Sequence, residues 1–580
     1  MNNIIFVNKK PIIYTIFLGA VLLCSLALST SASINLAITL TEKVIHRTLR
    51  DHTKWINILK GVVHIPLLFS ILTFYIQYTI FGNKTSQKIS ELWGHFTSEI
   101  KQKKYLYLFI VLTVFFSVAF YKVINADILF ADDMSRSHDG DRNWISFGRF
   151  ISEFLSILIH STIKLTDIAP LTQFISIIII TAAVITLLVV LNQNEKICFV
   201  NALPLTFLFL SPFFLQCFCY RFDSPYMTLS VLFPIIPFIF REDLKAYTFI
   251  TFVMLILCCM SYQSGQSVYI IIVIFLTVCK IINKEDLKQT ALFVAVSIAA
   301  YAASLLIYEL LFAANTNRTD NNYYYSTSVS LSAVISNLRY YAVYSTSRCG
   351  GLFTRTCFFL SLAVSFVAVA LKSKINKLLS AGIYAFALVL AFCLSMGPYI
   401  LFEHTVISGR TMMGFNSLAA IILYIAFSFT LETVKSKKLR TAFILPVIFC
   451  IYTSVSFLYT FGNALKIQKE YNNFRYTMLF KDLAVLVNTE EKPFVAFGGS
   501  TGYCNALEMV IKNYPLEYIP VTPSEHSIWN IDYSYRFNFM FEDEFFDEKP
   551  DWPLLVSNYY HDIYGKDNHF YVDLKNHSYK

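Results

Sequence analysis

Apolar runs of about 15 to 23 residues alternate with short polar segments along most of this chain. Runs of this length and composition are typical of helices that cross a bilayer. Thirteen of them predict membrane-spanning helices, at about residues 12–28, 62–81, 105–124, 170–191, 198–216, 226–240, 247–262, 267–283, 290–312, 352–371, 379–401, 415–431 and 441–461. The pattern therefore predicts an α-helical polytopic membrane protein, and the composition agrees, because only 15% of the 580 residues are charged.

Basic residues gather in short segments between the apolar runs, which gives the predicted helices an orientation. Residues 372–377 and 432–440 are strongly basic, as expected of cytoplasmic loops. Alternation from these loops places the N-terminus in the cytoplasm and the C-terminus on the outer side, although the basic residues 43–60 run against this rule. The net charge of +9 follows from these loops and does not indicate a nucleic-acid partner.

The last part of the chain changes character and predicts a separate small domain. Residues 465–487 have helical spacing, residues 494–497 form a short strand-like run before a glycine-rich turn, and residues 570–573 suggest a final strand. We therefore expect a C-terminal α/β domain on the outer side. The predicted division is a two-span extension (1–104), a membrane domain (105–461) and this outer domain (462–580).

The densest polar stretch lies at residues 126–149, where five carboxylates and three guanidiniums fall within 24 residues between two apolar regions. Charge at a membrane surface often marks function. Asp132 and Asp133 are adjacent, so one carboxylate could be held by partners while the other acts as a general base. Residues 144–160 have apolar positions at helical spacing and predict a helix lying along the outer surface.

Other outward charges are candidates for substrate binding, because arginine binds phosphate through a planar fork. They are Arg136, Arg142, Arg149, Arg221, Asp223 and Arg410. Structural alternatives stay open for two of them. Arg149 could pair with Glu153 one turn further on, and Arg221 could pair with Asp223.

These residues resemble those of the GtrII-type serotype-converting glucosyltransferases of bacteria and phages. The residues that match, in order, are Asp132, Asp133, Arg136, Gly140, Trp144, Gly148, Arg149 and the run at 221–225. The resemblance implies a GT-C-like architecture in the bacterial inner membrane. It also implies transfer of glucose from undecaprenyl-phosphate-glucose to lipid-linked O-antigen units on the periplasmic face, with a donor-synthesising glycosyltransferase and a flippase acting upstream. Residues 1–104 depart from the family's usual start.

In the mechanism that follows, Asp132 or Asp133 activates the acceptor hydroxyl and arginines stabilise the leaving phosphate, with inversion at the sugar carbon. A divalent metal between carboxylate and phosphate is compatible with this scheme, but no motif indicates a dedicated metal site. Two other classes of protein remain as alternatives, an O-antigen polymerase and a flippase or transporter of lipid-linked sugars. A transporter would be expected to carry ionisable residues in the middle of its spans, whereas here they lie in the outer loops.

Overall fold

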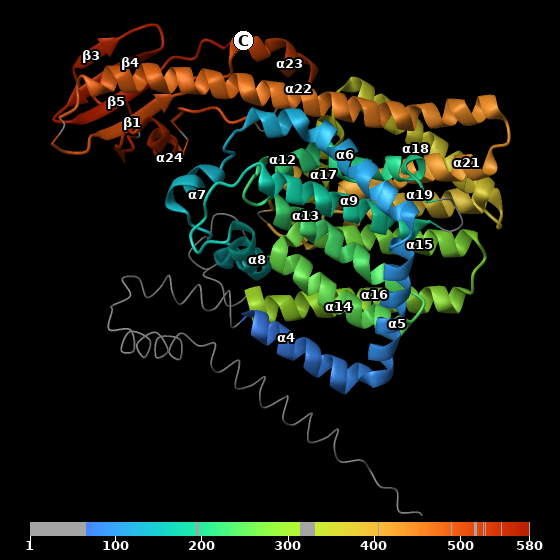
Figure 1. The fold of residues 1–580 in the computed structure, drawn as a ribbon. Coiled ribbons are helices and arrows are strands. Elements are labelled where there is room, and N and C mark those ends of the chain that lie inside the picture. Colours follow the sequence, from blue (N-terminus) through green and yellow to red (C-terminus); the bar gives the residue numbers. More distant parts are fainter. Residues whose placement is uncertain are drawn as a thin grey trace, which may run out of the picture.

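The computed structural model describes residues 65–192, 197–313, 331–403 and 405–578, apart from residues 489, 515–518, 526, 528 and 547. The predicted first span at 12–28 and the basic residues 43–60 lie outside these ranges. The described chain forms a bundle of long helices with a small sheet domain at one end, and helix α22 runs from the bundle into that domain (Figure 1).

Within the described ranges, nine helical segments are long and apolar enough to cross a membrane, and all nine coincide with predicted spans. They are α6 (Lys103–Ala126), α9 (Leu171–Leu191), α14 (Leu244–Ser261), η6 with α15 (Gln263–Ile282), α16 with η7 (Leu287–Phe312), α18 (Leu352–Lys372), α19 (Lys377–Leu394), α20 to α21 (Met413–Thr433) and α22 (Lys437–Ala484). The chain is thus a multi-pass helical membrane protein.

Two other predicted spans are irregular, and the described part of the span predicted at 62–81 is only the short helix α4 (Ile65–Ile76) followed by the π-helix η2 (Gln77–Phe81), so the count of thirteen is not established. The run at 198–216 is a broken pair, Phe199–Leu210 and Pro212–Cys219, bent by 66°. The break falls where Ser211 leaves helical geometry and its hydroxyl accepts a hydrogen bond from the backbone of Phe213, capping α12 (Pro212–Cys219). The run at 226–240 is shorter than the nine, and it turns into a 3-10 helix, η5 (Phe233–Phe240), that contains two prolines.

Shorter elements lie between these helices or form parts of the spans. They are α4 (Ile65–Ile76), η2 (Gln77–Phe81), α5 (Gly82–Ile100), α7 (Asp133–Asp139), η3 (Ile145–Phe147), α8 (Phe150–His160), α10 (Phe199–Ala202), η4 (Leu203–Thr206), α11 (Phe207–Leu210), α13 (Ser224–Leu232), α17 (Leu331–Arg348), η10 (Gly397–Leu401), η11 (Gly409–Thr411) and η12 (Ile425–Phe429). Helix α8 lies within the surface helix predicted at 144–160. Helices α5 and α17 were not predicted, because α5 is polar and α17 lies in a segment interpreted as a loop.

Helix α22 has 48 residues and continues without a break from its apolar half into the sheet domain. It packs along α6, and Gly462 marks their closest approach. A β-carbon at Gly462 would lie 2.6 Å from the carbonyl oxygen of Lys122 and 2.7 Å from the backbone nitrogen of Val123. Small residues at helix crossings allow such contact between backbones in membrane proteins.

We therefore expect Gly462→Val to destabilise the protein, because the added side chain forces α22 away from α6. Overpacking of this kind costs about 1–3 kcal/mol. Gly382→Val on α19 is the matched control, because nothing lies within 4 Å of a β-carbon at that position. Melting temperatures of the two variants in detergent give the comparison, and equal values would contradict this account of the crossing.

The C-terminal domain contains a five-stranded sheet in the order β2-β1-β5-β4-β3. Its elements are β1 (Phe494–Gly499), η13 (Asn505–Leu507), α23 (Glu508–Asn513), α24 (Asn530–Ser534), η14 (Tyr535–Phe537), β2 (Glu542–Asp543), β3 (Leu554–Ser557), β4 (His561–Lys566) and β5 (His569–Leu574). Strand β1 is parallel to β2 and β5, and β3, β4 and β5 are antiparallel. The predicted strands at 494–497 and 570–573 are confirmed, as is the small α/β domain.

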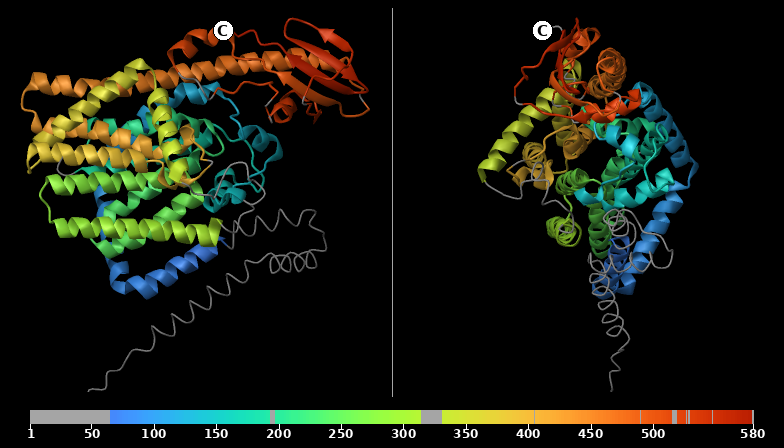
Figure 2. Two further views of the ribbon diagram at one scale, coloured as in Figure 1. Left: turned by 180° about the vertical axis from the view of Figure 1, so that it is seen from behind. Right: turned by 90° about the vertical axis from the view of Figure 1, so that its left-hand side faces the viewer.

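The sheet domain and the loop between α6 and α9 share one buried cluster. Tyr476 and Leu479 of α22 and Val495 of β1 are buried in it together with Met134 of α7 and Trp144. Figure 2 shows α7 and α8 at the same end of the bundle as the sheet. The charged loop therefore lies between the sheet domain and the ends of the membrane helices.

Candidate active site

The charged loop between α6 and α9 is folded by two short helices. Helix α7 (Asp133–Asp139) ends at Gly140, which has a φ of +69°. A β-carbon at Gly140 would lie 3.0 Å from the carbonyl oxygen of Leu165, so glycine suits both the turn and the close approach. This turn returns the chain toward α8 and holds α7 beside the membrane helices.

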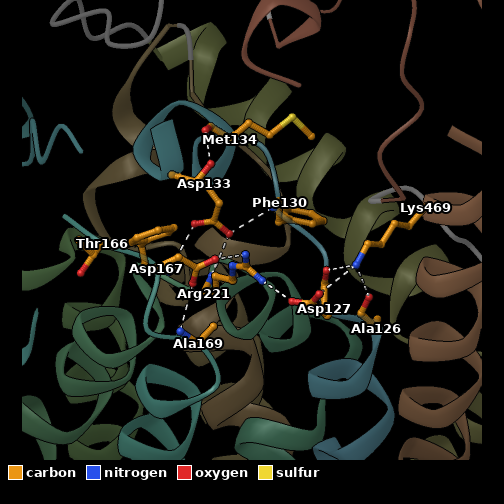
Figure 3. A network of polar contacts seen from close by, with 12 residues as sticks. Ala126, Asp127, Phe130, Asp133, Met134, Thr166, Asp167, Ala169, Arg221 and Lys469 are labelled. Carbon is orange, nitrogen blue, oxygen red and sulfur yellow. Dashed lines mark hydrogen bonds and ion pairs between the residues drawn. The ribbon is translucent and has the colours of Figure 1, made fainter. Parts of the chain in front are cut away.

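Asp133 is fully buried and makes structural contacts rather than facing a cavity. Its carboxylate accepts hydrogen bonds from the backbone nitrogens of Phe130 (3.2 Å), Arg221 (3.0 Å) and Phe222 (3.3 Å). Burial, together with the nearby Asp223 carboxylate, raises the pKa of Asp133 to about 8, against the opposing effect of those hydrogen bonds. Figure 3 shows Asp133 between α7 and the turn at Arg221, so it fixes one segment to the other.

Asp132 differs from its neighbour, because it is exposed at the start of α7. Within the described residues its carboxylate makes no hydrogen bond, and it lies close enough to the Tyr220 hydroxyl to interact with it electrostatically. An exposed carboxylate on a fixed helix end is available to accept a proton from a substrate. Of the two predicted base candidates, the geometry favours Asp132.

Arg410, in the 3-10 turn η11 (Gly409–Thr411), also contacts Tyr220. Its Nη1 donates to the Tyr220 hydroxyl at 3.1 Å. Its backbone is fixed by α12 and by η6, because its nitrogen donates to Oε1 of Gln216 (2.8 Å) and its carbonyl accepts from the Ser264 hydroxyl (3.1 Å). The loop that carries Arg410 is therefore held rigidly against α12 and η6.

Arg149 begins α8 and points toward the same region. Its guanidinium carbon lies 4.3 Å from the centre of the Tyr262 ring, and its Nε donates to Oε1 of Gln263 at 3.2 Å. Ser264, which donates to the Arg410 carbonyl oxygen, directly follows Gln263, so Arg149 and Arg410 contact neighbouring residues of η6. We call Asp132, Arg149, Tyr220, Tyr262 and Arg410 the interfacial cluster.

Arg221 lies outside this cluster in a separate ion-pair network. It is buried and pairs with Asp127 at 2.7 Å and with Asp167, while Lys469 of α22 pairs with Asp127 at 3.1 Å (Figure 3). Partial burial alone would raise the pKa of Asp127, but Lys469 and Arg221 outweigh it and lower that pKa. Two cations are thus neutralised by two carboxylates.

The remaining predicted residues, Arg136, Arg142 and Asp223, form a buried framework. The guanidinium of Arg136 lies 4.0 Å from the centre of the Trp144 ring and 3.4 Å from the Asp223 carboxylate. The indole nitrogen of Trp144 also donates to Asp223.

Arg142 donates from Nε to Glu153 at 2.8 Å. Glu153 therefore pairs with Arg142, whereas the sequence suggested Arg149 as its partner. Likewise, the suggested pair of Arg221 with Asp223 is replaced by Arg221 with Asp127 and Asp167, and by Asp223 with Arg136.

Sequence reasoning missed several residues around the cluster. Tyr262 and Gln263 lie at the break between α14 and η6, where the predicted spans 247–262 and 267–283 leave only a short connection, and the Tyr-Gln-Ser-Gly composition there was the one signal of a further role. The partners of Arg221 are distant in sequence and carried no distinguishing pattern. No group of three or more metal-ligating side chains occurs among the described residues.

Fold and cluster together define a multi-pass helical membrane protein with a carboxylate and two arginines gathered at one end of its bundle. Comparison with known proteins gives the family. The profile described as "Glucosyl transferase GtrII" matches residues 121–421, just over half of the chain, and this protein belongs to that family.

A curated relative gives weaker support. The chain is 25% identical over 247 residues to an uncharacterised 55.3 kDa protein from the gtrB 5′ region of Salmonella phage P22. The match covers 41% of this chain and 50% of the phage protein, so the chain spans about half the length of that relative. No solved structure matches the chain significantly.

Proposed function

We propose that this protein is a membrane glucosyltransferase that modifies O-antigen, as in serotype conversion. In this proposal glucose passes from undecaprenyl-phosphate-glucose to lipid-linked O-antigen units at the periplasmic face of the inner membrane. The observation that supports it best is the placement of Arg410 against Tyr220 and of Arg149 against Tyr262, with the exposed carboxylate of Asp132 near enough to act electrostatically on Tyr220. Membership of the GtrII family supports the same reaction class.

The reaction assigns a separate task to each part of the site. Asp132 removes the proton from an acceptor hydroxyl, whose oxygen attacks the anomeric carbon of glucose. The bond between that carbon and the phosphate oxygen breaks, so a single displacement inverts the anomeric carbon. The phosphate gains one negative charge as it leaves, and the guanidiniums of Arg149 and Arg410 stabilise that charge. Asp133, Arg136 and Asp223 keep α7 and the turn at Tyr220 in place.

A lipid-linked donor fits the position of these groups. The cluster lies where α8 and the broken helices meet the outer domain, and a polyprenyl phosphate carries its phosphate at the same depth as such an interface. In the proposed topology this side is periplasmic, so the donor would be supplied by a synthesising glycosyltransferase and a flippase. Residues 105–461 would form the catalytic membrane domain, 462–580 the periplasmic domain, and 1–104 an extension.

Purified protein given labelled donor and O-antigen acceptor tests the reaction directly. Transfer should occur from undecaprenyl-phosphate-glucose and not from UDP-glucose. Transfer from UDP-glucose in the absence of any lipid carrier would overturn the proposed donor. A catalytically dead Asp132→Asn preparation, purified in parallel, controls for contaminating transferases.

The proposed topology places the N-terminus in the cytoplasm and the C-terminus in the periplasm. Alkaline phosphatase fused after residue 580 should be active, because that enzyme matures only outside the cytoplasm, and a cytoplasmic fluorescent reporter fused there should be dark. A fusion in the basic segment 432–440 is the control and should give the reverse. The opposite pattern would place the interfacial cluster on the wrong side of the membrane for this donor.

A further inference from the structure

Two apolar cavities of about 770 Å³ each lie along the helical bundle. The first, the α6–α9 groove, is lined by residues of those two helices, including Val114, Val118 and Phe174, with Arg221 and Asp127 also in its lining. The second, the α16–η10 groove, is lined by Ala302, Leu305 and other residues of α16, with η6 and η10 opposite. Either groove is large enough to hold part of a lipid chain.

The α16–η10 groove is mostly apolar, with a few polar groups in its lining. Its walls are formed by side chains such as Leu305, Leu306, Leu394 and Leu401. Its polar lining comes mainly from two glutamines and two tyrosines, which are joined in pairs. Gln263 donates from Nε2 to the Tyr308 hydroxyl at 3.0 Å, and the Tyr301 hydroxyl donates to Oε1 of Gln266 at 2.8 Å. Such a groove suits a ligand with a polar head and a long apolar chain.

The polar side of this groove is continuous with the interfacial cluster. Gln263 lines the groove and accepts the hydrogen bond from Nε of Arg149 at 3.2 Å. Gln263 also donates to the carbonyl oxygen of Phe147 at 2.6 Å, which fixes the segment just before Arg149. A ligand in the groove would therefore have its head beside Arg149, with Arg410 across the Tyr262 and Tyr220 rings.

Contact with the interfacial cluster distinguishes the two grooves. At the α6–α9 groove, Arg221 already faces Asp127 and Asp167, and Asp127 also pairs with Lys469, so the two cations are balanced by two carboxylates. At the α16–η10 groove, Glu309 contributes one carboxylate to the lining, and the adjoining cluster supplies two guanidiniums and Asp132. In the proposed reaction the guanidiniums of the cluster meet the phosphate that gains charge, so a donor in this groove has its phosphate at the reacting centre.

We propose that the α16–η10 groove binds the polyprenyl chain of the sugar donor and delivers its phosphate to Arg149. This inference rests on the proposed function and adds to it the route by which the donor enters. The groove then determines how strongly the enzyme prefers a long isoprenoid chain. In this proposal the α6–α9 groove does not bind the donor and is open to other membrane lipids.

A single bulky side chain can test the groove without disturbing the core. Ala302 and Ala303 are consecutive, exposed residues of α16, but only Ala302 lines the groove. Ala302→Trp should fill the groove, whereas Ala303→Trp places the same side chain beside it as a matched control. Val118→Trp, at an exposed position in the α6–α9 groove, fills the other cavity.

The measurement compares KM for undecaprenyl-phosphate-glucose with KM for a short-chain analogue, citronellyl-phosphate-glucose, at saturating acceptor. Ala302→Trp should raise the KM of the long-chain donor by about ten-fold, as expected when roughly two methylene contacts are lost, and change that of the analogue much less. Ala303→Trp and Val118→Trp should leave both values near those of the wild type.

Three results would overturn the inference. They are an unchanged long-chain KM in Ala302→Trp, an equal rise for both donors, or a selective rise in Val118→Trp, which would place the chain in the α6–α9 groove. Failure of the proposed function looks different, because wild-type protein would then transfer no glucose from either polyprenyl-phosphate donor. Crosslinking of a radiolabelled polyprenyl phosphate to a benzophenone residue at position 302, compared with 303, gives a readout independent of turnover.

Discussion

Replacing Asp132 by Asn should reduce glucose transfer by about 10²–10⁴-fold, the usual contribution of a general base. The substitution keeps the shape of the side chain and removes its ability to take a proton. Asp132 is exposed and its carboxylate makes no hydrogen bond within the described residues, so the folded protein loses no contact. Melting temperature and yield in detergent should therefore equal those of the wild type, while turnover with labelled lipid-linked glucose falls.

Asp133→Asn is the matched comparison, because it makes the same chemical change one residue further on. Here an amide nitrogen would replace one of two oxygens that accept from the backbone of Phe130, Arg221 and Phe222. At least one buried N–H would lose its acceptor, which costs about 1–3 kcal/mol. We expect this variant to lose thermal stability as well as activity. Near-normal turnover in Asp132→Asn, with a stable but inactive Asp133→Asn, would exchange the roles assigned to the two carboxylates.

Asp132 and Asp133 also show which features of the site could be predicted from the sequence and which could not. Their charge density at a membrane surface identified the loop, and the apolar runs identified the nine long helices that surround it. Burial could not be inferred, because adjacent residues at the start of a helix point in different directions, and only tertiary packing decides which one meets the turn at Arg221. The same limit applies to Arg136, which ordinary spacing rules cannot distinguish from Arg149, although Arg136 is buried against Trp144.

Breaks in helices were the other feature hidden in the sequence. Hydropathy registers an apolar run in the same way whether the helix is continuous or interrupted, so Ser211 passed as part of an ordinary span, and the four residues between the spans predicted at 247–262 and 267–283 passed as a plain connection. In a membrane such interruptions are tolerated where neighbouring protein satisfies the exposed backbone. The second helix of the broken pair, α12, and the 3-10 turn η6 anchor Arg410, and this explains why segments far apart in sequence meet at one cluster.

Alanine at Arg149 or at Arg410 should each lower kcat/KM for the lipid donor by about 10²–10³-fold, the usual loss when one stabilising donor is removed from a developing anion. Acceptor KM should change little, because the proposed partner of both guanidiniums is the leaving phosphate. Lysine at either position keeps the charge but not the planar fork, nor the stacking of Arg149 over Tyr262 at 4.3 Å, so it should restore only part of the rate. Arg339→Lys, at an exposed position on α17, is the control and should behave as wild type.

The double variant Arg149→Ala/Arg410→Ala distinguishes one shared phosphate from two separate partners. If both guanidiniums bind the same leaving group, the two losses are coupled, and the double variant should fall short of the product of the single effects. Independent partners would give simple multiplication of the two losses. That result, or a loss that appears in acceptor KM and not in donor kcat/KM, would show that Arg149 and Arg410 do not stabilise the same leaving phosphate. The proposed displacement, in which Asp132 activates the acceptor while both arginines stabilise that phosphate, would then be wrong.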